Sequence, residues 1–104
     1  MVDIGMIQEM VRRIVAAVDP VRVVLFGSQA RGGAGPESDL DFLIIQETDL
    51  PRPKRSAPLY SLLRDFPCSK DILVYTPREV EEDAALPHAL VTTALREGKV
   101  LYEK

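Results

Sequence analysis

The alternation of helical segments with short apolar runs is what most constrains the fold of this 104-residue chain. Apolar residues recur every three or four positions across 3–18, which predicts an amphipathic helix with one buried face. Aliphatic and β-branched runs at 21–26, 40–45 and 71–75 predict strands, and 100–102 predicts a last short strand. This order predicts an α/β fold, a small mixed β-sheet with helices packed on it.

Polar and proline-rich segments connect these strands. Short helices are expected at 28–31 and at about 59–66. Residues 46–57 are polar and contain Pro51 and Pro53, so we expect a surface loop there. The run at 40–45 is the most apolar of the strands, which places it at the centre of the predicted sheet.

The longest helix is expected at 77–97, broken or kinked near Pro87. Thr76 is suited to cap its first turn, because Glu79 stands in the capping-box position. Glu79 and the acidic residues after it are expected to form a solvated helix face. Gly98 is expected to end the helix.

Composition limits the classes of partner. The length predicts one domain, spanning 1–104. The formal net charge of −3 argues against general nucleic-acid binding, although Arg52, Lys54 and Arg55 form a candidate basic patch. Cys68 is the only cysteine, so no intrachain disulfide is expected. Neither a membrane span nor a signal peptide is expected, which favours a cytoplasmic location.

A glycine-serine pair, Gly27-Ser28, directly follows the strand predicted at 21–26. Small residues let backbone N–H groups approach a phosphate closely, and a helix N-terminus favours anions. Arg31 lies one helical turn further on and can reach the same phosphates. The plainer alternative is a strand-to-helix turn in which Ser28 only caps the helix.

Three carboxylates stand at the heads of two predicted strands. Asp39 and Asp41 are one residue apart, so both project from the same face of their strand. Their mutual repulsion is relieved by a divalent cation, although an Asp-x-Asp pair can also be a solvated strand start. Asp71 opens an apolar strand in the same way, and completes a three-carboxylate cluster if the two strands are neighbours. The sequence therefore favours a site for a nucleoside triphosphate with divalent metal.

Taken together, these elements resemble the signature of the nucleotidyltransferase superfamily typified by DNA polymerase beta. The resemblance rests on Gly27-Ser28-x-x-Arg31-Gly32, Ser38-Asp39-x-Asp41 and the apolar strand headed by Asp71. The short length is similar to the minimal, stand-alone branch (MNT), whose members are often antitoxin partners of HEPN-domain proteins. The motifs span residues 21–75, and the resemblance in fold covers nearly the whole chain.

The resemblance implies a role for each residue of the glycine-serine segment. Gly27 and Ser28 would hold the β- and γ-phosphates of ATP, the expected substrate. Arg31 would make a secondary phosphate contact.

The resemblance also implies roles for the three acids. Asp39 and Asp41 would ligate Mg²⁺ that bridges to the triphosphate. Asp71 would join a second, catalytic Mg²⁺ and help to activate the acceptor hydroxyl. The product would be a nucleoside monophosphate joined to the acceptor, with pyrophosphate released.

By resemblance, the chain is expected to transfer AMP from ATP to a hydroxyl, that of a tyrosine, on a HEPN-type toxin, and so to act as an antitoxin by AMPylation. Larger family members add a helical domain that grips the base and the acceptor. Here a second copy of the chain, a partner protein, or both would supply those contacts. One alternative is a non-catalytic antitoxin that neutralises its partner by complex formation. Another is nucleotidyl transfer to a small molecule.

Overall fold

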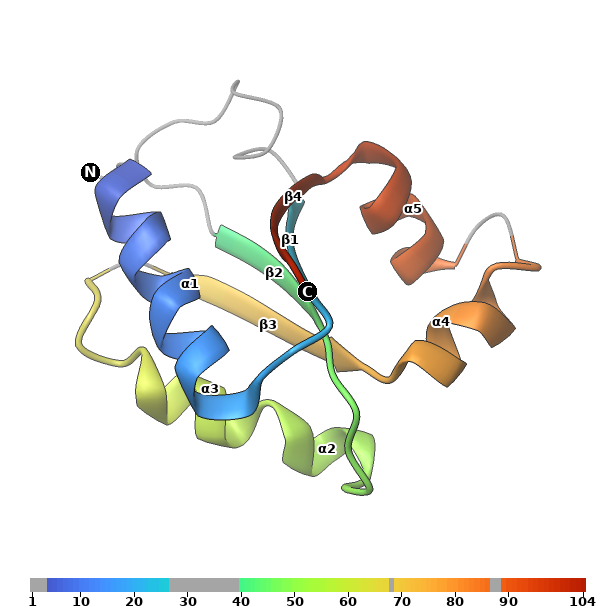
Figure 1. Ribbon diagram of the computed structural model, residues 1–104, viewed down its shortest axis with the longest axis horizontal. Coiled ribbons are helices and arrows are strands. Elements are labelled where there is room, and N and C mark those ends of the chain that lie inside the picture. The colour runs from blue at the N-terminus through green and yellow to red at the C-terminus, as the bar shows by residue number, and fades with distance from the viewer. Residues whose placement is uncertain (1–3, 27–39, 68, 87–88) are drawn as a thin grey trace.

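The computed structural model describes residues 4–26, 40–67, 69–86 and 89–104. Four strands form one mixed sheet in the order β3-β2-β1-β4 (Figure 1). They are β1 (Arg22–Phe26), β2 (Leu40–Ile45), β3 (Lys70–Tyr75) and β4 (Lys99–Glu103). Strand β1 is antiparallel to both β2 and β4, whereas β2 and β3 are parallel. The predicted mixed sheet is confirmed, and β2 is an inner strand as expected.

Helices cover both faces of this sheet (Figure 1). They are α1 (Ile4–Val18), α2 (Arg52–Arg55), α3 (Ala57–Leu62), α4 (Pro77–Asp83) and α5 (Leu90–Glu97). Residues of α1 and α3 pack with one face of β2, where Phe42 is fully buried beside Met10 and Leu59. Residues of α5 pack with the other face, where Leu43 is buried beside Val91. Burial on both sides explains why β2 is almost continuously apolar.

The segment 46–57, expected to be a surface loop, contains a short helix. Helix α2 begins directly after Pro51, and Pro53 lies in its first turn. Proline is tolerated there because the first N–H groups of a helix have no partner within the helix. The helix expected at about 59–66 also begins earlier, with Pro58 in its first turn, and ends at Leu62. These prolines therefore begin helices instead of marking a loop.

The helix expected at 77–97 is interrupted between Asp83 and Leu90. Pro87, which predicted the break, lies outside the described residues. At the start of α4 the capping box is present as expected. The Glu79 N–H donates to Thr76 Oγ1 at 3.2 Å, and the Thr76 N–H donates to Glu79 Oε1 at 2.9 Å.

Strand β4 pairs with β1 through an irregular register. Val23 is opposite Tyr102 and Val24 is opposite Val100, so Leu101 has no partner across the pair. Such a β-bulge bends the strand and locally increases its twist. Among the described residues, no helix has the length and apolar character that crossing a bilayer requires.

Gly98 ends α5, as predicted, but its backbone is extended and not left-handed. Glycine is needed here because of close approach: a Cβ at this position would lie 2.7 Å from Val24 Cγ1 and would clash with the Ala94 carbonyl oxygen. Its N–H donates to that same carbonyl at 2.8 Å. The turn from α5 into β4 therefore packs directly against β1.

We expect the substitution Gly98→Ala to lower the free energy of unfolding by about 2 kcal/mol or more, because backbone must move to admit the methyl group. Urea denaturation followed by circular dichroism measures this change. Gly5→Ala is the matched control, since Gly5 is exposed in the first turn of α1. There alanine should leave stability unchanged or raise it by up to about 1 kcal/mol. Equal effects of the two substitutions would contradict the close-approach argument.

Candidate active site

Two of the predicted acids lie side by side at one end of the sheet. Asp41 is the second residue of β2 and Asp71 is the second residue of β3. The two residues are partners in the parallel register of these strands. Neighbouring parallel strands lie about 4.8 Å apart, and residues in register point to the same face. The strand headed by Asp71 is therefore next to the strand that carries Asp41, which is the condition for a shared carboxylate site.

Both acids lie on the sheet face covered by α4 and α5. Further along this face, β2 contributes Leu43 and β3 contributes Leu73 to the apolar core. Asp41 is half-buried, whereas the other five residues of β2 are buried. Asp71 is exposed. The carboxylate pair thus stands where the apolar face of the sheet meets solvent, accessible to a ligand.

The start of this strand pair is held by backbone hydrogen bonds. The Leu40 N–H donates to the Ser69 carbonyl at 3.0 Å, directly before the two acids. On the other side of β2, Asp41 is the register partner of Phe26, the last residue of β1. The ends of three strands therefore meet around the two carboxylates.

The remaining predicted site residues lie outside the described residues: Gly27, Ser28, Arg31 and Asp39. Their proposed contacts to phosphate and metal stay predictions. Within the described ranges, no group of three or more His, Cys, Asp or Glu side chains is placed to hold a metal ion. The donor set that is described, two carboxylates in register, suits Mg²⁺, which prefers oxygen ligands and is often held by one or two carboxylates together with phosphate.

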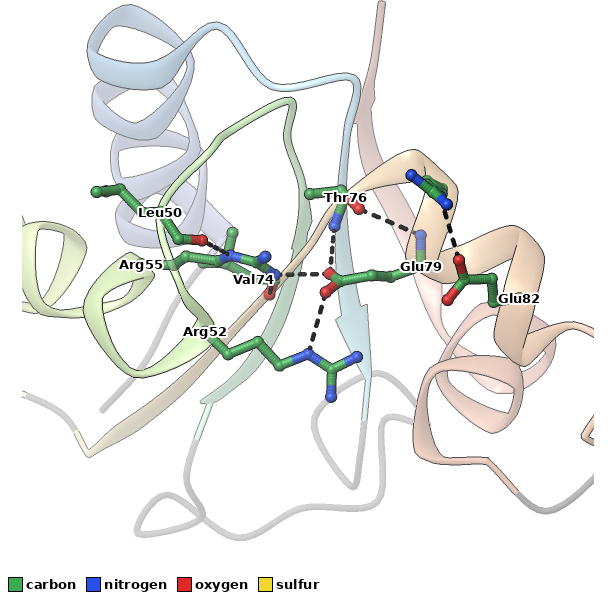
Figure 2. Close-up of polar contacts among 8 residues, drawn as sticks. Leu50, Arg52, Arg55, Val74, Thr76, Glu79 and Glu82 are labelled. Carbon is green, nitrogen blue, oxygen red and sulfur yellow. Dashed lines mark hydrogen bonds and ion pairs between the residues drawn. The ribbon is translucent and has the colours of Figure 1, made fainter.

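A second polar cluster, which no sequence pattern predicted, lies at the opposite end of β3. Glu79 of α4 accepts from Arg55 Nη1 at 2.6 Å and from Arg52 Nε at 3.3 Å (Figure 2). Arg55 also donates to the carbonyl oxygens of Val74, at 3.3 Å, and Leu50, at 2.8 Å. The cluster joins α2 to α4 and to the end of β3.

Burial distinguishes Glu79 from Glu81 and Glu82 of the same helix. Its side chain is 21% exposed and that of Arg55 is 9% exposed, so both charges are largely removed from solvent. Hydrogen bonding from Arg55 is the main cause that lowers the pKa of Glu79 to about 2, against the opposing effect of burial. The expectation of a solvated face is therefore wrong for Glu79, and Asp83 is half-buried, whereas Glu81 and Glu82 are exposed as expected.

Two of the three basic residues of the candidate patch make ion pairs within the protein. Arg52 and Arg55 pair with Glu79, and the Arg52 guanidinium lies 4.5 Å from the centre of the Tyr75 ring. The capping-box pattern correctly predicted the backbone contacts of Glu79. Nothing local in the sequence pairs it with arginines more than twenty residues earlier.

The chain matches the family model described as the nucleotidyltransferase domain over residues 7–103. It therefore belongs to this family, which confirms the nucleotidyltransferase family expected from the sequence, while its minimal, stand-alone branch stays a prediction. No match is found among curated proteins.

Solved structures support the same fold. A protein from Sulfolobus solfataricus that carries the name of a nucleotidyltransferase aligns with a TM-score of 0.64 and 18% identity, covering 96% of this chain and 79% of its own. A toxin–antitoxin structure with AMP-PNP aligns with a TM-score of 0.53 and 17% identity, covering 93% of this chain and 73% of its own. At these identities the likeness concerns the fold, and it confirms the nucleotidyltransferase fold.

The Glu79 cluster predicts a pH-dependent stability. Because the pKa of Glu79 is about 2 in the folded protein and 4.5 ordinarily, the carboxylate stabilises the fold above pH 4.5, and this contribution is lost as pH falls toward 2. We expect Glu79→Gln to lower the free energy of unfolding by about 2–3 kcal/mol at pH 7. Urea denaturation at a series of pH values should show the difference from wild type shrinking between about pH 5 and pH 2.

Glu82→Gln is the matched control on the same helix. Glu82 pairs with Arg78 at 3.2 Å, but both side chains are mostly exposed, at 62% and 87%. Such a pair contributes about 0.5 kcal/mol or less. A loss as large for Glu82→Gln as for Glu79→Gln would show that burial of the cluster is not the cause.

Proposed function

We propose that this chain is a Mg²⁺-dependent nucleotidyltransferase that transfers AMP from ATP to a hydroxyl, that of a tyrosine, on a HEPN-type toxin, and thereby acts as an antitoxin. The observation that carries the proposal is the register pairing of Asp41 with Asp71 in a member of the nucleotidyltransferase family. The likeness in fold to a toxin–antitoxin structure with AMP-PNP supports the toxin partner and the adenine nucleotide.

In this proposal the described acids act as the metal-binding pair. Asp41 and Asp71 lie in register on adjacent strands and would present their carboxylate oxygens to one bound ion at this end of the sheet. Asp39, two residues before Asp41 in sequence, is proposed as the third ligand. Bound Mg²⁺ would lower the negative charge on the triphosphate and favour ionisation of the acceptor hydroxyl.

The glycine-serine segment is proposed to bind the triphosphate. Gly27 directly follows Phe26, whose register partner is Asp41, so the chain leaves β1 beside the acids. Gly27 and Ser28 would bind the β- and γ-phosphates, with Arg31 as a further phosphate contact. The triphosphate would then be oriented with its α-phosphorus toward the carboxylate pair.

The chemistry proposed is a single displacement. The acceptor oxygen forms a bond to the α-phosphorus, and the bond from that phosphorus to the bridging oxygen of pyrophosphate breaks. Asp71, the exposed member of the pair, would help to activate the acceptor hydroxyl. The acceptor itself is proposed to come from the partner protein.

The test uses the chain co-purified with the protein encoded beside it, incubated with Mg²⁺ and ATP labelled on either the α- or the γ-phosphate. We expect label from the α-phosphate, and none from the γ-phosphate, to appear on the partner. Transfer should fall by roughly a hundredfold or more in Asp41→Asn and in Asp71→Asn, because each removes a charged metal ligand. Gel autoradiography with mass spectrometry of the partner measures both the transfer and the acceptor residue.

Asp49→Asn is the matched control, since Asp49 is exposed and lies beyond the end of β2, away from the acids. It should transfer AMP as the wild type does. Tight complex formation without label from any nucleoside triphosphate would support the non-catalytic antitoxin instead. Label that persists in Asp41→Asn would contradict the assigned metal site.

A further inference from the structure

The tyrosine of α3 contacts the backbone of the strand that bears Asp71. The Ile72 N–H donates to the Tyr60 hydroxyl at 2.9 Å. Among the strands that the structure describes, β3 is at the edge of the sheet and pairs only with β2. The hydrogen bond is therefore donated by an N–H on the outer side of β3, where no described strand lies.

This N–H belongs to the peptide unit that joins Asp71 to Ile72. The described chain contains no cis peptide bond, so the N–H and the C=O of this unit point in opposite directions. With the Ile72 N–H directed to α3, the Asp71 carbonyl faces β2. Pairing with β2 and the Tyr60 hydroxyl thus hold the two sides of one peptide plane. Holding this plane restricts the direction in which the Asp71 side chain leaves the backbone.

Helix α3 is itself firmly anchored, so that the hydroxyl has a defined position. Leu59 and Leu63, on either side of Tyr60, are buried in the core shared with α1. Arg13 of α1 donates to the Leu62 carbonyl at 3.3 Å and pairs with Asp65 at 2.7 Å. The Tyr60 hydroxyl therefore links the start of β3 to a helix whose position is fixed by packing.

We propose that Tyr60 is a positioning residue for the candidate active site, whose hydroxyl holds the Asp71–Ile72 peptide so that Asp71 stays aligned with Asp41 for metal binding. The inference rests on the proposed function, because it concerns the same pair of carboxylates. It assigns to α3 a task beyond packing: to set the geometry of a ligand on the neighbouring strand.

The variant Tyr60→Phe removes the hydroxyl and keeps the ring. Tyr60 is 38% exposed, so we expect the variant to fold as the wild type does. Titration of the chain with Mn²⁺ alone, followed by electron paramagnetic resonance, should show binding weaker by about threefold to tenfold, the range that one neutral hydrogen bond contributes. Exchange of the Ile72 amide with solvent deuterium should become faster.

Two further variants separate positioning from general stability. Tyr102→Phe makes the same chemical change on β4, at the other edge of the sheet, and should leave Mn²⁺ binding unchanged. In a chain that already carries Asp71→Asn, adding Tyr60→Phe should weaken Mn²⁺ binding no further, because the tyrosine acts through that carboxylate. A further loss in the double variant would overturn the inference.

The remaining outcomes distinguish the two proposals. If the wild type binds Mn²⁺ and Tyr60→Phe binds it equally well, the role of Tyr60 is wrong and the proposed function stands. If the wild type binds no Mn²⁺, the proposed metal site is wrong and the role of Tyr60 fails with it.

Discussion

The parallel pairing of β2 with β3 is the interaction on which the site depends. It brings together two carboxylates that are remote in sequence and places them on one face of the sheet. Backbone hydrogen bonds flank the paired strands at both ends. The Leu40 N–H donates to the Ser69 carbonyl, and the Gln46 N–H donates to the Tyr75 carbonyl. A slip of one residue would turn Asp71 toward the opposite face and bring Ile72 beside Asp41. The apolar residues that follow each acid make such a slip costly, because those after Asp41 are buried on both faces of β2, and Ile72 and Val74 are buried on one face of β3.

The two ends of β3 show how environment decides what a carboxylate does. At the start of the strand, Asp41 and Asp71 stand beside each other at the solvent boundary, an arrangement that favours a bound cation. Beyond its end, Glu79 is held by Arg55 and Arg52 and by the first turn of its own helix. There the positive charges that pair with the carboxylate are the two arginine side chains. The Glu79 cluster thus stabilises the fold, whereas the pair of Asp41 and Asp71 is proposed to bind a metal ion.

Sequence patterns predicted the structural features that depend on residues close together in the sequence. Apolar runs located the strands, and the pattern from Thr76 to Glu79 located the start of α4, because both rest on periods of a few residues. Helix α2 was missed because proline was taken to mark a loop, although the first turn of a helix tolerates it. The arginine partners of Glu79 and the contact from Tyr60 to Ile72 were missed for another reason. They join segments whose proximity is set only by the folded sheet.

Of the candidate site, the sequence identified Asp41 and Asp71 as acids heading two strands, and the register makes them neighbours. That step required the strand order, which local pattern does not determine. For Gly27, Ser28, Arg31 and Asp39, the motif remains the basis of prediction. Their roles depend on a bound nucleotide as much as on the protein, so the metal and transfer experiments are the direct way to examine them.

The bulge at Leu101 affects whether copies of this chain can associate through the edges of their sheets. An unpaired edge strand that is regular and flat acts as a template for aggregation. At the β4 edge the bulge breaks the regular spacing of backbone donors and acceptors, and Lys99 is exposed at the first position of the strand. At the β3 edge, side chains of α2 and α3 already occupy the Val74 carbonyl and the Ile72 N–H. Both edges therefore resist the addition of a further strand, which limits fibril-like growth.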